Sequence, residues 1–248
     1  TGLILYKDKK LHVINTVKDG DLHLHEVAGM IDLNPGTEII AQVDKNRRWD
    51  IMRNHSATHF LHAALRKILG NHVQQAGSYV GPDHLRFDFT HFTKLSPEEL
   101  SDIEALVNQQ TRKNLTRQRH HDVPIEEAKK MCALMFFGDK YGDKVNVIQF
   151  GDFTMEFCGG THVLNSSQIG LFKIISEASI ASGVRRIEAV TGAGVEKYIQ
   201  SQLEHMKQFG HRIDELLETK KKLEKEISDL KLKEKLEQLD HILSLHSV

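Results

Sequence analysis

The residues with the clearest chemical potential are histidines on one side of a helix expected over residues 55–69. At about 100° per residue, His55, His59 and His62 fall in one narrow stripe with Arg66, and the apolar side chains gather on the opposite side. Two histidines four residues apart on a helix can bind the same metal ion. An ordinary polar helix face explains the stripe equally well, so the stripe alone does not decide between the two.

A second pair of candidate ligands follows much later, in the segment Phe157-Cys158-Gly159-Gly160-Thr161-His162. Its spacing is Cys-x-x-x-His, and the two glycines allow a tight backbone path that turns both side chains to one point. Thiolate and imidazole ligands suit zinc better than calcium or magnesium. Taken together, His55, His59, Cys158 and His162 form a complete tetrahedral zinc set.

The remaining histidines and the second cysteine carry weaker signals. The chain has 16 histidines in 248 residues, most without an expected role. His23 and His25 alternate along the polar side of an expected strand, so we expect them to be exposed. His62 is expected either beside the metal site or at the surface. Cys132 lies among apolar residues of an expected helix and is interpreted as a small buried hydrophobic side chain.

Composition excludes several classes of protein. Lys and Arg number 33 and Asp and Glu number 34, so the net charge of −1 excludes a protein that holds nucleic acid by overall positive charge. Two cysteines exclude a secreted disulfide scaffold. No apolar run approaches the ~18 residues of a membrane span, and the first residues lack the features of a signal peptide. We therefore expect a cytoplasmic protein without membrane contact.

The elements that must position the candidate ligands fall into three expected domains. Residues 1–50 contain short strands separated by turns at Asp19-Gly20 and Asn34-Pro35-Gly36, which predicts a small β-barrel. Residues 51–195 have helices and strands in separate runs, which predicts an α+β domain with an antiparallel sheet. Residues 196–248 are highly charged, with leucines at three- and four-residue spacing, which predicts a coiled-coil-like helical arm. Such an arm either forms a homodimer or packs within its own chain.

Local signals mark the ends of the helices in the middle domain. Asn54 is the expected N-cap of the histidine-bearing helix, and Gly70 is its expected end. Ser96-Pro97-Glu98-Glu99 predicts a helix start, with Ser96 as N-cap and Glu99 reaching back to it. A further helix is expected to begin near Pro124 and to run through Met131.

Seven strings of this sequence closely resemble the editing domain of bacterial alanyl-tRNA synthetases, over residues 53–195. They are RNHSATHFLHAALR (53–66), VQQAGS (73–78), LRFDF (85–89), FGDKYGD (137–143), FCGGTH (157–162), IGLFKIISE (169–177) and GVRRIEAVTG (183–192). The chain departs from the family at Asp139, Asn146 and Phe157, which affects fine substrate contacts, whereas all four candidate ligands match. The resemblance also extends to a small β-barrel before this domain and a charged helical arm after it.

The resemblance implies hydrolysis of the ester that joins tRNA(Ala) to a wrongly attached serine or glycine, with zinc as cofactor. A binding site discriminates only ~10–200-fold against such close analogues of alanine, so a second hydrolytic site is required. Four protein ligands would close a zinc site, although catalytic zinc keeps one open position. Two readings remain: one ligand such as His162 yields to water or substrate, or zinc mainly positions the aminoacyl group.

The same resemblance assigns roles to residues outside the ligand set. Gln75 is expected to contact the aminoacyl end, and Thr161 either reaches the substrate or orients His162. Arg185 and Arg186 are expected to bind terminal phosphates of the tRNA. The alternative is that one of these arginines pairs with Glu188. Asp88 is expected either to compensate local charge or to be a structural strand residue.

Two basic segments are candidates for contact with tRNA phosphates. The denser one spans residues 111–121 and includes Arg112, Lys113, Arg117 and Arg119. The second consists of Lys45, Arg47 and Arg48, with Trp49 available for stacking on a base. A solvated surface explains either charge run equally well.

One reading of the whole chain is favoured, and three alternatives are considered. The chain begins with Thr1 and contains no recognisable class II aminoacylation motif, so we expect an internal piece of a longer synthetase. A free-standing editing protein is the nearest alternative, although it would not need the charged arm. The editing domain of threonyl-tRNA synthetases has similar metal-type residues, but GVRRIEAVTG favours the alanyl family. A non-catalytic module, in which zinc is structural and the piece only binds tRNA or dimerises, is the third alternative.

Overall fold

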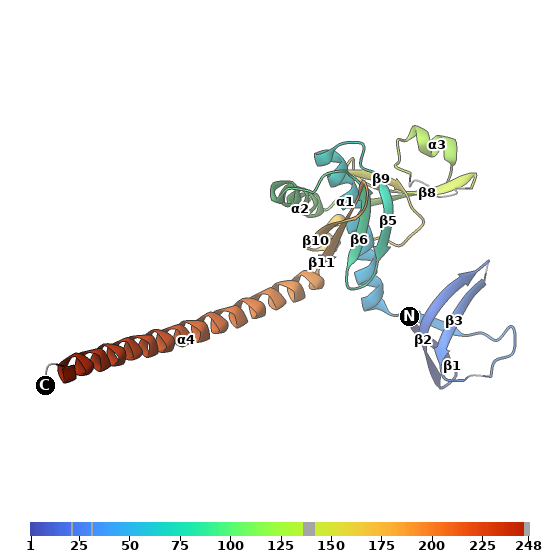
Figure 1. Cartoon of the computed structure of the whole chain (residues 1–248). Coiled ribbons are helices and arrows are strands. Elements are labelled where there is room, and N and C mark those ends of the chain that lie inside the picture. Colours follow the sequence, from blue (N-terminus) through green and yellow to red (C-terminus); the bar gives the residue numbers. More distant parts are fainter. Residues whose placement is uncertain (21, 31, 136–141, 246–248) are drawn as a thin grey trace. The chain divides into compact units, whose positions relative to one another are not determined.

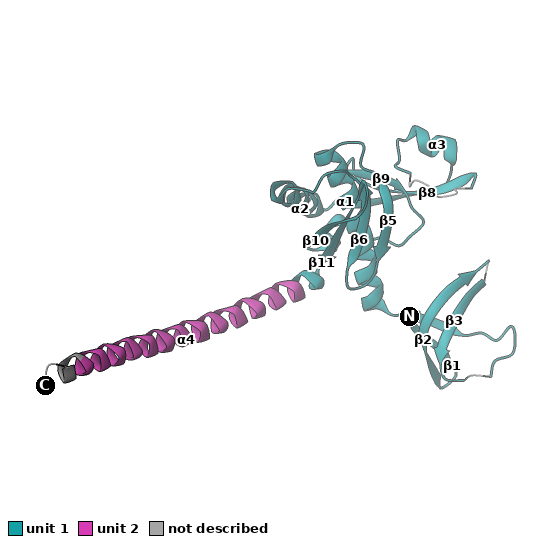
Figure 2. Cartoon of the chain, viewed as in Figure 1, with its two compact units in different colours: residues 1–195 teal, residues 196–248 magenta. Residues whose placement is uncertain are grey.

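The computed structural model of the chain describes residues 1–20, 22–30, 32–135 and 142–245. It divides into two compact units, residues 1–195 and residues 196–248 (Figure 2). The predicted fold class, α+β with antiparallel sheets, a small N-terminal sheet and a long C-terminal helix, is confirmed (Figure 1). Asp139 and most of the FGDKYGD string lie outside the described residues.

The first four strands form a small antiparallel sheet of order β3-β2-β1-β4. They are β1 (Gly2–Tyr6), β2 (Lys9–Asp19), β3 (Leu22–Ala28) and β4 (Ile40–Val43). In the described chain β3 and β4 lie at the two edges, so the strands predicted as a barrel form an open sheet. Its buried core is limited to Ile4, Leu11 and Val13. His23 and His25 are exposed on β3, as predicted.

The histidine-bearing helix α1 (Lys45–Leu69) starts earlier than its apolar pattern predicts. Asp44 is the N-cap, and its side chain accepts a hydrogen bond from Arg47 N at 3.1 Å. The prediction of Asn54 as N-cap is therefore wrong, because residues 45–49 of α1 are exposed and mostly polar and the apolar pattern begins only after them. Asn54 is buried and its side chain donates to Gly81 O at 2.8 Å. The predicted end at Gly70 is confirmed, with φ of 115°.

Two antiparallel sheets follow α1 in the first unit. One has the order β10-β11-β6-β5, and the other has the order β7-β8-β9. Their strands are β5 (Gln75–Val80), β6 (Leu85–Thr90), β7 (Arg117–Pro124), β8 (Lys144–Phe150), β9 (Thr154–Phe157), β10 (Phe172–Ala181) and β11 (Val184–Thr191). The core that joins α1 to these sheets is apolar and fully buried, and its largest side chains are Phe60, Phe87, Phe89, Phe150 and Phe172. This core fixes one face of α1, so the histidines on its other face have a rigid support.

Three short elements complete this unit: α2 (Pro97–Arg112), α3 (Ile125–Lys130) and the 3-10 helix η1 (Ser166–Ile169). The predicted capping box of α2 is confirmed, since Glu99 N donates to Ser96 Oγ at 3.1 Å and Ser96 N donates to Glu99 Oε2 at 2.8 Å. Cys132 is exposed, contrary to the prediction of a buried side chain. The reason is that α3 ends at Lys130, and Cys132 follows in a turn with φ of 60°.

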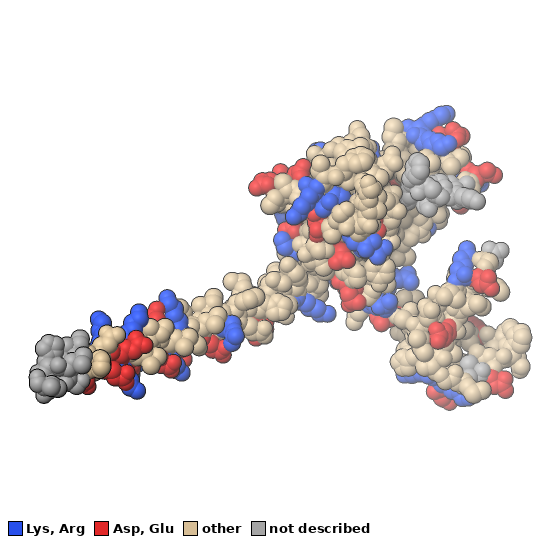
Figure 3. Space-filling model, in the orientation of Figure 1, with Lys and Arg blue, Asp and Glu red and all other residues tan. Residues whose placement is uncertain are grey.

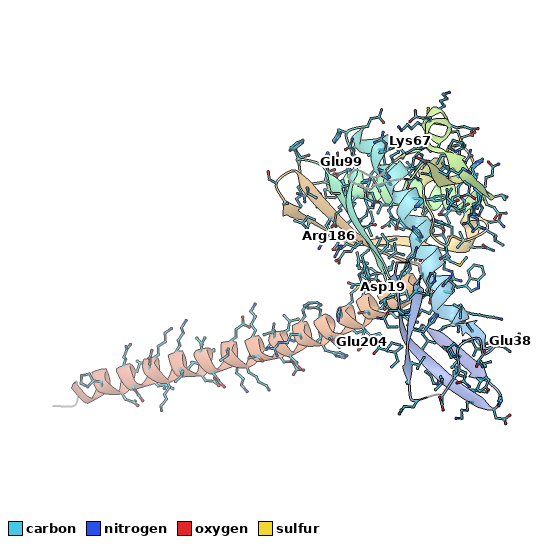
Figure 4. The ribbon with its side chains drawn as sticks, turned by 90° about the vertical axis from the view of Figure 1, so that its right-hand side faces the viewer. Asp19, Glu38, Lys67, Glu99, Arg186 and Glu204 are labelled. Atoms are coloured by element: carbon cyan, nitrogen blue, oxygen red, sulfur yellow. The ribbon has the colours of Figure 1, made fainter. Side chains whose placement is uncertain are left out.

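The second unit contains most of α4 (Ala193–Leu245), one continuous helix as predicted. Residues 199–241 are all exposed, and side chains project from every side of the helix (Figure 4). Lys, Arg, Asp and Glu are mixed along it (Figure 3). None of the helices in the described ranges combines the length and the apolar character that a membrane crossing requires.

Candidate metal centre

Two elements bring four metal-binding side chains to one point. His55 and His59 lie one turn apart on α1, and Cys158 and His162 lie on the loop that leaves β9. One ligand atom from each of these four side chains lies within 4.8 Å of the other three. Residues far apart in the sequence therefore form the cluster that their types and spacing predicted.

The distances within the cluster are short. Cys158 Sγ lies 3.3 Å from His162 Nε2 and 3.5 Å from His55 Nε2. The ring centroids of His55 and His162 are 4.0 Å apart, and those of His59 and His162 are 4.5 Å apart. His59 and His162 are buried, whereas His55 and Cys158 are partly exposed. The cluster thus has a buried side and a side open to solvent.

A distinct oxygen faces the Nδ1 atom of each histidine. His55 Nδ1 is 3.2 Å from the carbonyl oxygen of Thr161, and His162 Nδ1 is 3.2 Å from Ser56 Oγ. His59 Nδ1 is 3.4 Å from a carboxylate oxygen of Glu156. Metal-binding histidines usually direct their second ring nitrogen to such an oxygen, which leaves Nε2 for the metal. The oxygens around the cluster therefore fit a resident zinc ion.

Gly160 lets the loop pass directly against the His55 ring. A Cβ atom at this position would lie 2.2 Å from His55 Cε1, whereas at Gly159 the nearest atom would be Asn146 Nδ2 at 4.0 Å. No side-chain carbon is tolerated at the shorter distance. The glycine at 160 is thus required by close approach to a candidate ligand, and the glycine at 159 is not.

Burial sets the protonation state of the cluster. It lowers the pKa of His59 well below its ordinary value. It also lowers the pKa of His162 to about 2, with further contributions from His55, Arg117 and Arg119. Burial raises the pKa of the Cys158 thiol to about 11. The imidazoles are therefore neutral and ready to bind a cation at neutral pH, whereas the thiol must lose a proton to do so.

Two of the predicted tRNA-binding arginines lie beside this cluster, on β7. Arg117 Nη1 donates to the carbonyl oxygen of His162 at 2.7 Å, which fastens the ligand loop to the strand. Arg119 is exposed, and its charge acts on both Cys158 and His162. It therefore offers an exposed guanidinium within electrostatic reach of these two side chains. The other two, Arg112 and Lys113, are exposed at the end of α2.

The second predicted pair of arginines makes ion pairs in the larger sheet. Arg186 binds Asp88 through two hydrogen bonds of 2.7 and 2.8 Å, and Figure 4 labels it on its strand. Arg185 pairs with Glu177. Glu188, the partner considered from sequence, instead accepts a hydrogen bond from Ser176 Oγ at 3.1 Å. These contacts favour a structural role for Arg185 and Arg186 over phosphate binding, with carboxylates on neighbouring strands as their partners. Asp88 compensates the charge of Arg186.

The two predicted substrate contacts have different surroundings. Gln75 is partly exposed on β5, and its side chain donates to Ser78 Oγ at 3.5 Å. Thr161 is exposed, and its backbone carbonyl meets His55 while Ser56 meets His162. The orienting role considered for Thr161 therefore applies to His55 and not to His162.

Sequence reasoning missed the oxygens that surround the ligands. Ser56 follows His55 directly and is fully buried, and Glu156 lies two residues before Cys158 in β9 and is 1% exposed. A glutamate on the inward side of a short apolar strand was a usable signal, because such a side chain is almost never fully buried without a partner. Ser56 had no such signal, since serine is common on helices for many reasons.

Comparison with known proteins finds sequences that are similar to this chain. Residues 145–188 match the family described as the threonyl and alanyl tRNA synthetase second additional domain. An alanine–tRNA ligase of Chlorobium chlorochromatii is 44% identical over 256 residues, which cover 93% of this chain and 29% of the relative. Alanine–tRNA ligases of Bacteroides fragilis and Bacteroides thetaiotaomicron are 50% and 42% identical over 81% and 100% of this chain. The chain spans less than a third of the length of these relatives.

Proposed function

Because this chain is related to alanine–tRNA ligases, as its resemblance predicted, we propose that it is the editing part of such an enzyme. Its substrate would be tRNA(Ala) carrying serine or glycine, and the reaction would be hydrolysis of the aminoacyl ester. The proposed place of this reaction is the cytoplasm. The single observation that carries the proposal is the convergence of His55, His59, Cys158 and His162.

The ligand set supports zinc as the cofactor. Three imidazoles and one thiolate are typical zinc ligands, and their Nδ1 atoms face oxygens as in known zinc sites. A bound zinc ion supplies a Lewis acid for the carbonyl oxygen of an ester. Because His55 and Cys158 are partly exposed, this side of the cluster is the route by which an aminoacyl end would approach.

The residues around the open side have proposed roles of their own. Arg119 binds a phosphate of the tRNA end, since it is exposed, bears a charge and lies beside the ligands. Gln75 and the side chain of Thr161 contact the aminoacyl group. Arg117 keeps the ligand loop in place through the His162 carbonyl. The buried face of α1 excludes water from the opposite side of the cluster.

The test is deacylation of Ser-tRNA(Ala) by the purified chain and by Cys158→Ala. We expect the wild type to release serine. The rate of this release should fall by at least about 100-fold in the variant, which lacks one ligand. The matched control is Cys132→Ala, which removes the exposed cysteine of the α3 turn and should keep full activity. Wild-type protein that carries zinc but releases no serine above the Cys158→Ala rate would refute the hydrolase.

One observation favours a second candidate, a non-catalytic zinc-stabilised module that binds tRNA or dimerises. Four protein side chains complete a tetrahedral zinc site, as in structural centres. In that case Cys158→Ala would lose folding stability and zinc together, and neither protein would deacylate the tRNA. If elemental analysis of metal-replete protein found far less than one zinc ion per chain, both candidate functions would be contradicted.

A further inference from the structure

Glu156 is the residue near the cluster whose position is hardest to explain by packing alone. It is 1% exposed, and its carboxylate lies between two histidines of α1. Oε2 is 3.4 Å from His59 Nδ1, and Oε1 is 3.0 Å from His62 Nδ1. Thr154 Oγ1 also donates to Oε1, at 3.3 Å. A carboxylate is costly to bury, so this arrangement must have hydrogen-bond donors to compensate it.

His59 depends on this carboxylate. Its side chain is buried, and its Nδ1 atom makes no hydrogen bond within the part of the chain that the structure describes. The oxygen that faces this atom is Glu156 Oε2, at an ion-pair distance of 3.4 Å. When Nδ1 carries the proton toward this oxygen, the lone pair of the ring lies on Nε2.

The other two ligand histidines are held by neutral oxygens, the Thr161 carbonyl and the Ser56 hydroxyl. His59 alone faces a charged acceptor. A carboxylate partner orients a metal-binding imidazole and also makes its other nitrogen a better donor to the metal. His59 is thus the ligand whose affinity for a cation depends most on its neighbour.

We propose that Glu156 is a positioning residue for the metal centre, which fixes His59 in the tautomer and orientation that present Nε2 to zinc. His62 supports this arrangement, because its Nδ1 hydrogen bond of 3.0 Å holds the other carboxylate oxygen, Oε1. His62, the third histidine of the helical stripe, therefore supports the site and does not bind the metal. The inference rests on the proposed zinc site.

The first experiment measures zinc affinity of the full chain by competition with a chromogenic chelator, for the wild type and Glu156→Gln. Loss of such an outer partner typically lowers metal affinity about 10–100-fold, and we expect a decrease in this range. The matched control is Glu177→Gln, which removes another enclosed carboxylate, the partner of Arg185 in the larger sheet. It should bind zinc with the wild-type affinity.

A second readout separates positioning from general destabilisation. Cobalt(II) in place of zinc has an absorption spectrum that reports the geometry of its ligands. The spectrum should change for Glu156→Gln and stay unchanged for Glu177→Gln. Equal zinc affinities and identical cobalt spectra for the wild type and Glu156→Gln would overturn the proposal.

The third readout needs no variant, so it holds even when Glu156→Gln fails to fold. Nitrogen-15 NMR of the zinc-loaded wild type distinguishes imidazole tautomers. We expect His59 with a protonated Nδ1 and a zinc-bound Nε2, and the opposite tautomer would refute the role of Glu156. A wild type that binds no zinc would refute the proposed zinc site itself, and the inference with it.

Discussion

At the scale of single residues, the His55 ring depends on a neighbour that has no side chain. Gly160→Ala would place a carbon 2.2 Å from His55 Cε1, so the ring or the loop must move. We expect zinc affinity to fall by at least 10-fold, as an order of magnitude for a displaced ligand. Chelator competition measures it.

Gly159→Ala is the matched control for this substitution. Its new Cβ would have no heavy atom closer than 4.0 Å, and it changes the same loop by the same methyl group. Zinc affinity should stay at the wild-type level. Equal losses in the two variants would mean that the loop responds to any added carbon and that contact with His55 is not the cause.

The Cys158 thiol gives a prediction about protons. Its pKa of about 11 in the metal-free protein means that it is protonated at neutral pH. Zinc binds thiolate, so binding should release about one proton per ion. Calorimetric titration of zinc in two buffers with different ionisation enthalpies measures this number. A heat of binding that does not depend on the buffer would contradict the prediction.

The buried histidines predict how stability depends on pH without metal. In the folded protein the pKa of His59 and of His162 lies below the ordinary value, so the unfolded chain binds these protons at higher pH than the folded chain does. Stability from these groups is therefore complete above about pH 6.5 and is lost as the pH falls below it. Urea unfolding at pH of about 7.5 and 5.5 should show a lower free energy of unfolding at the lower pH.

His162→Gln provides the comparison for that pH dependence. Glutamine cannot take up the proton, so the decrease between the two pH values should be smaller in the variant. If the free energy of unfolding decreased by the same amount in the wild type and in the variant, groups other than His162 would be the cause.

The convergence of His55, His59, Cys158 and His162 was predictable, because residue type and spacing alone indicate a metal site. Imidazoles at i and i+4 and a Cys-x-x-x-His segment are informative without knowledge of the fold. The roles of Arg185 and Arg186 were not predictable, because their partners Glu177 and Asp88 are set by strand pairing. A charged residue in an edge or central strand has many possible neighbours until the register is known.

At the scale of elements, helix ends were predictable where a side chain makes the cap. The capping box of α2 was recognised because both of its hydrogen bonds are local in sequence. The start of α1 was missed because its first turns, residues 45–53, carry mostly polar side chains and no apolar stripe. Periodicity detects the buried part of a helix and not its exposed extension.

The capping box carries a quantitative prediction for the stability of the first unit. Ser96→Ala removes the acceptor for Glu99 N and should destabilise the protein by about 1 kcal/mol. Ser101→Ala, on an exposed position inside α2, is the control and should have little effect. Urea unfolding measures both. A loss as small for Ser96→Ala as for Ser101→Ala would show that α2 does not depend on its cap.

At the scale of the whole molecule, the sequence of α4 is the feature that most strongly indicates packing against another helix. Its large apolar side chains from Leu203 to Leu239 are more than half exposed, among them Leu223 at 53%, Ile227 at 51% and Leu230 at 61%. These three lie on one side of the helix at three- and four-residue spacing, as in a coiled-coil seam. Contiguous exposed apolar surface of this kind favours association with another helix.

We therefore expect the chain to self-associate through α4. Changing Leu223, Ile227 and Leu230 together to alanine keeps the helix propensity but removes the seam, so sedimentation velocity should shift from dimer to monomer. The control changes Lys221, Lys225 and Ser228 to alanine on the opposite side of the same turns, and it should remain dimeric. A wild type that stays monomeric at every concentration, with α4 still helical by circular dichroism, would favour packing of the arm within its own chain.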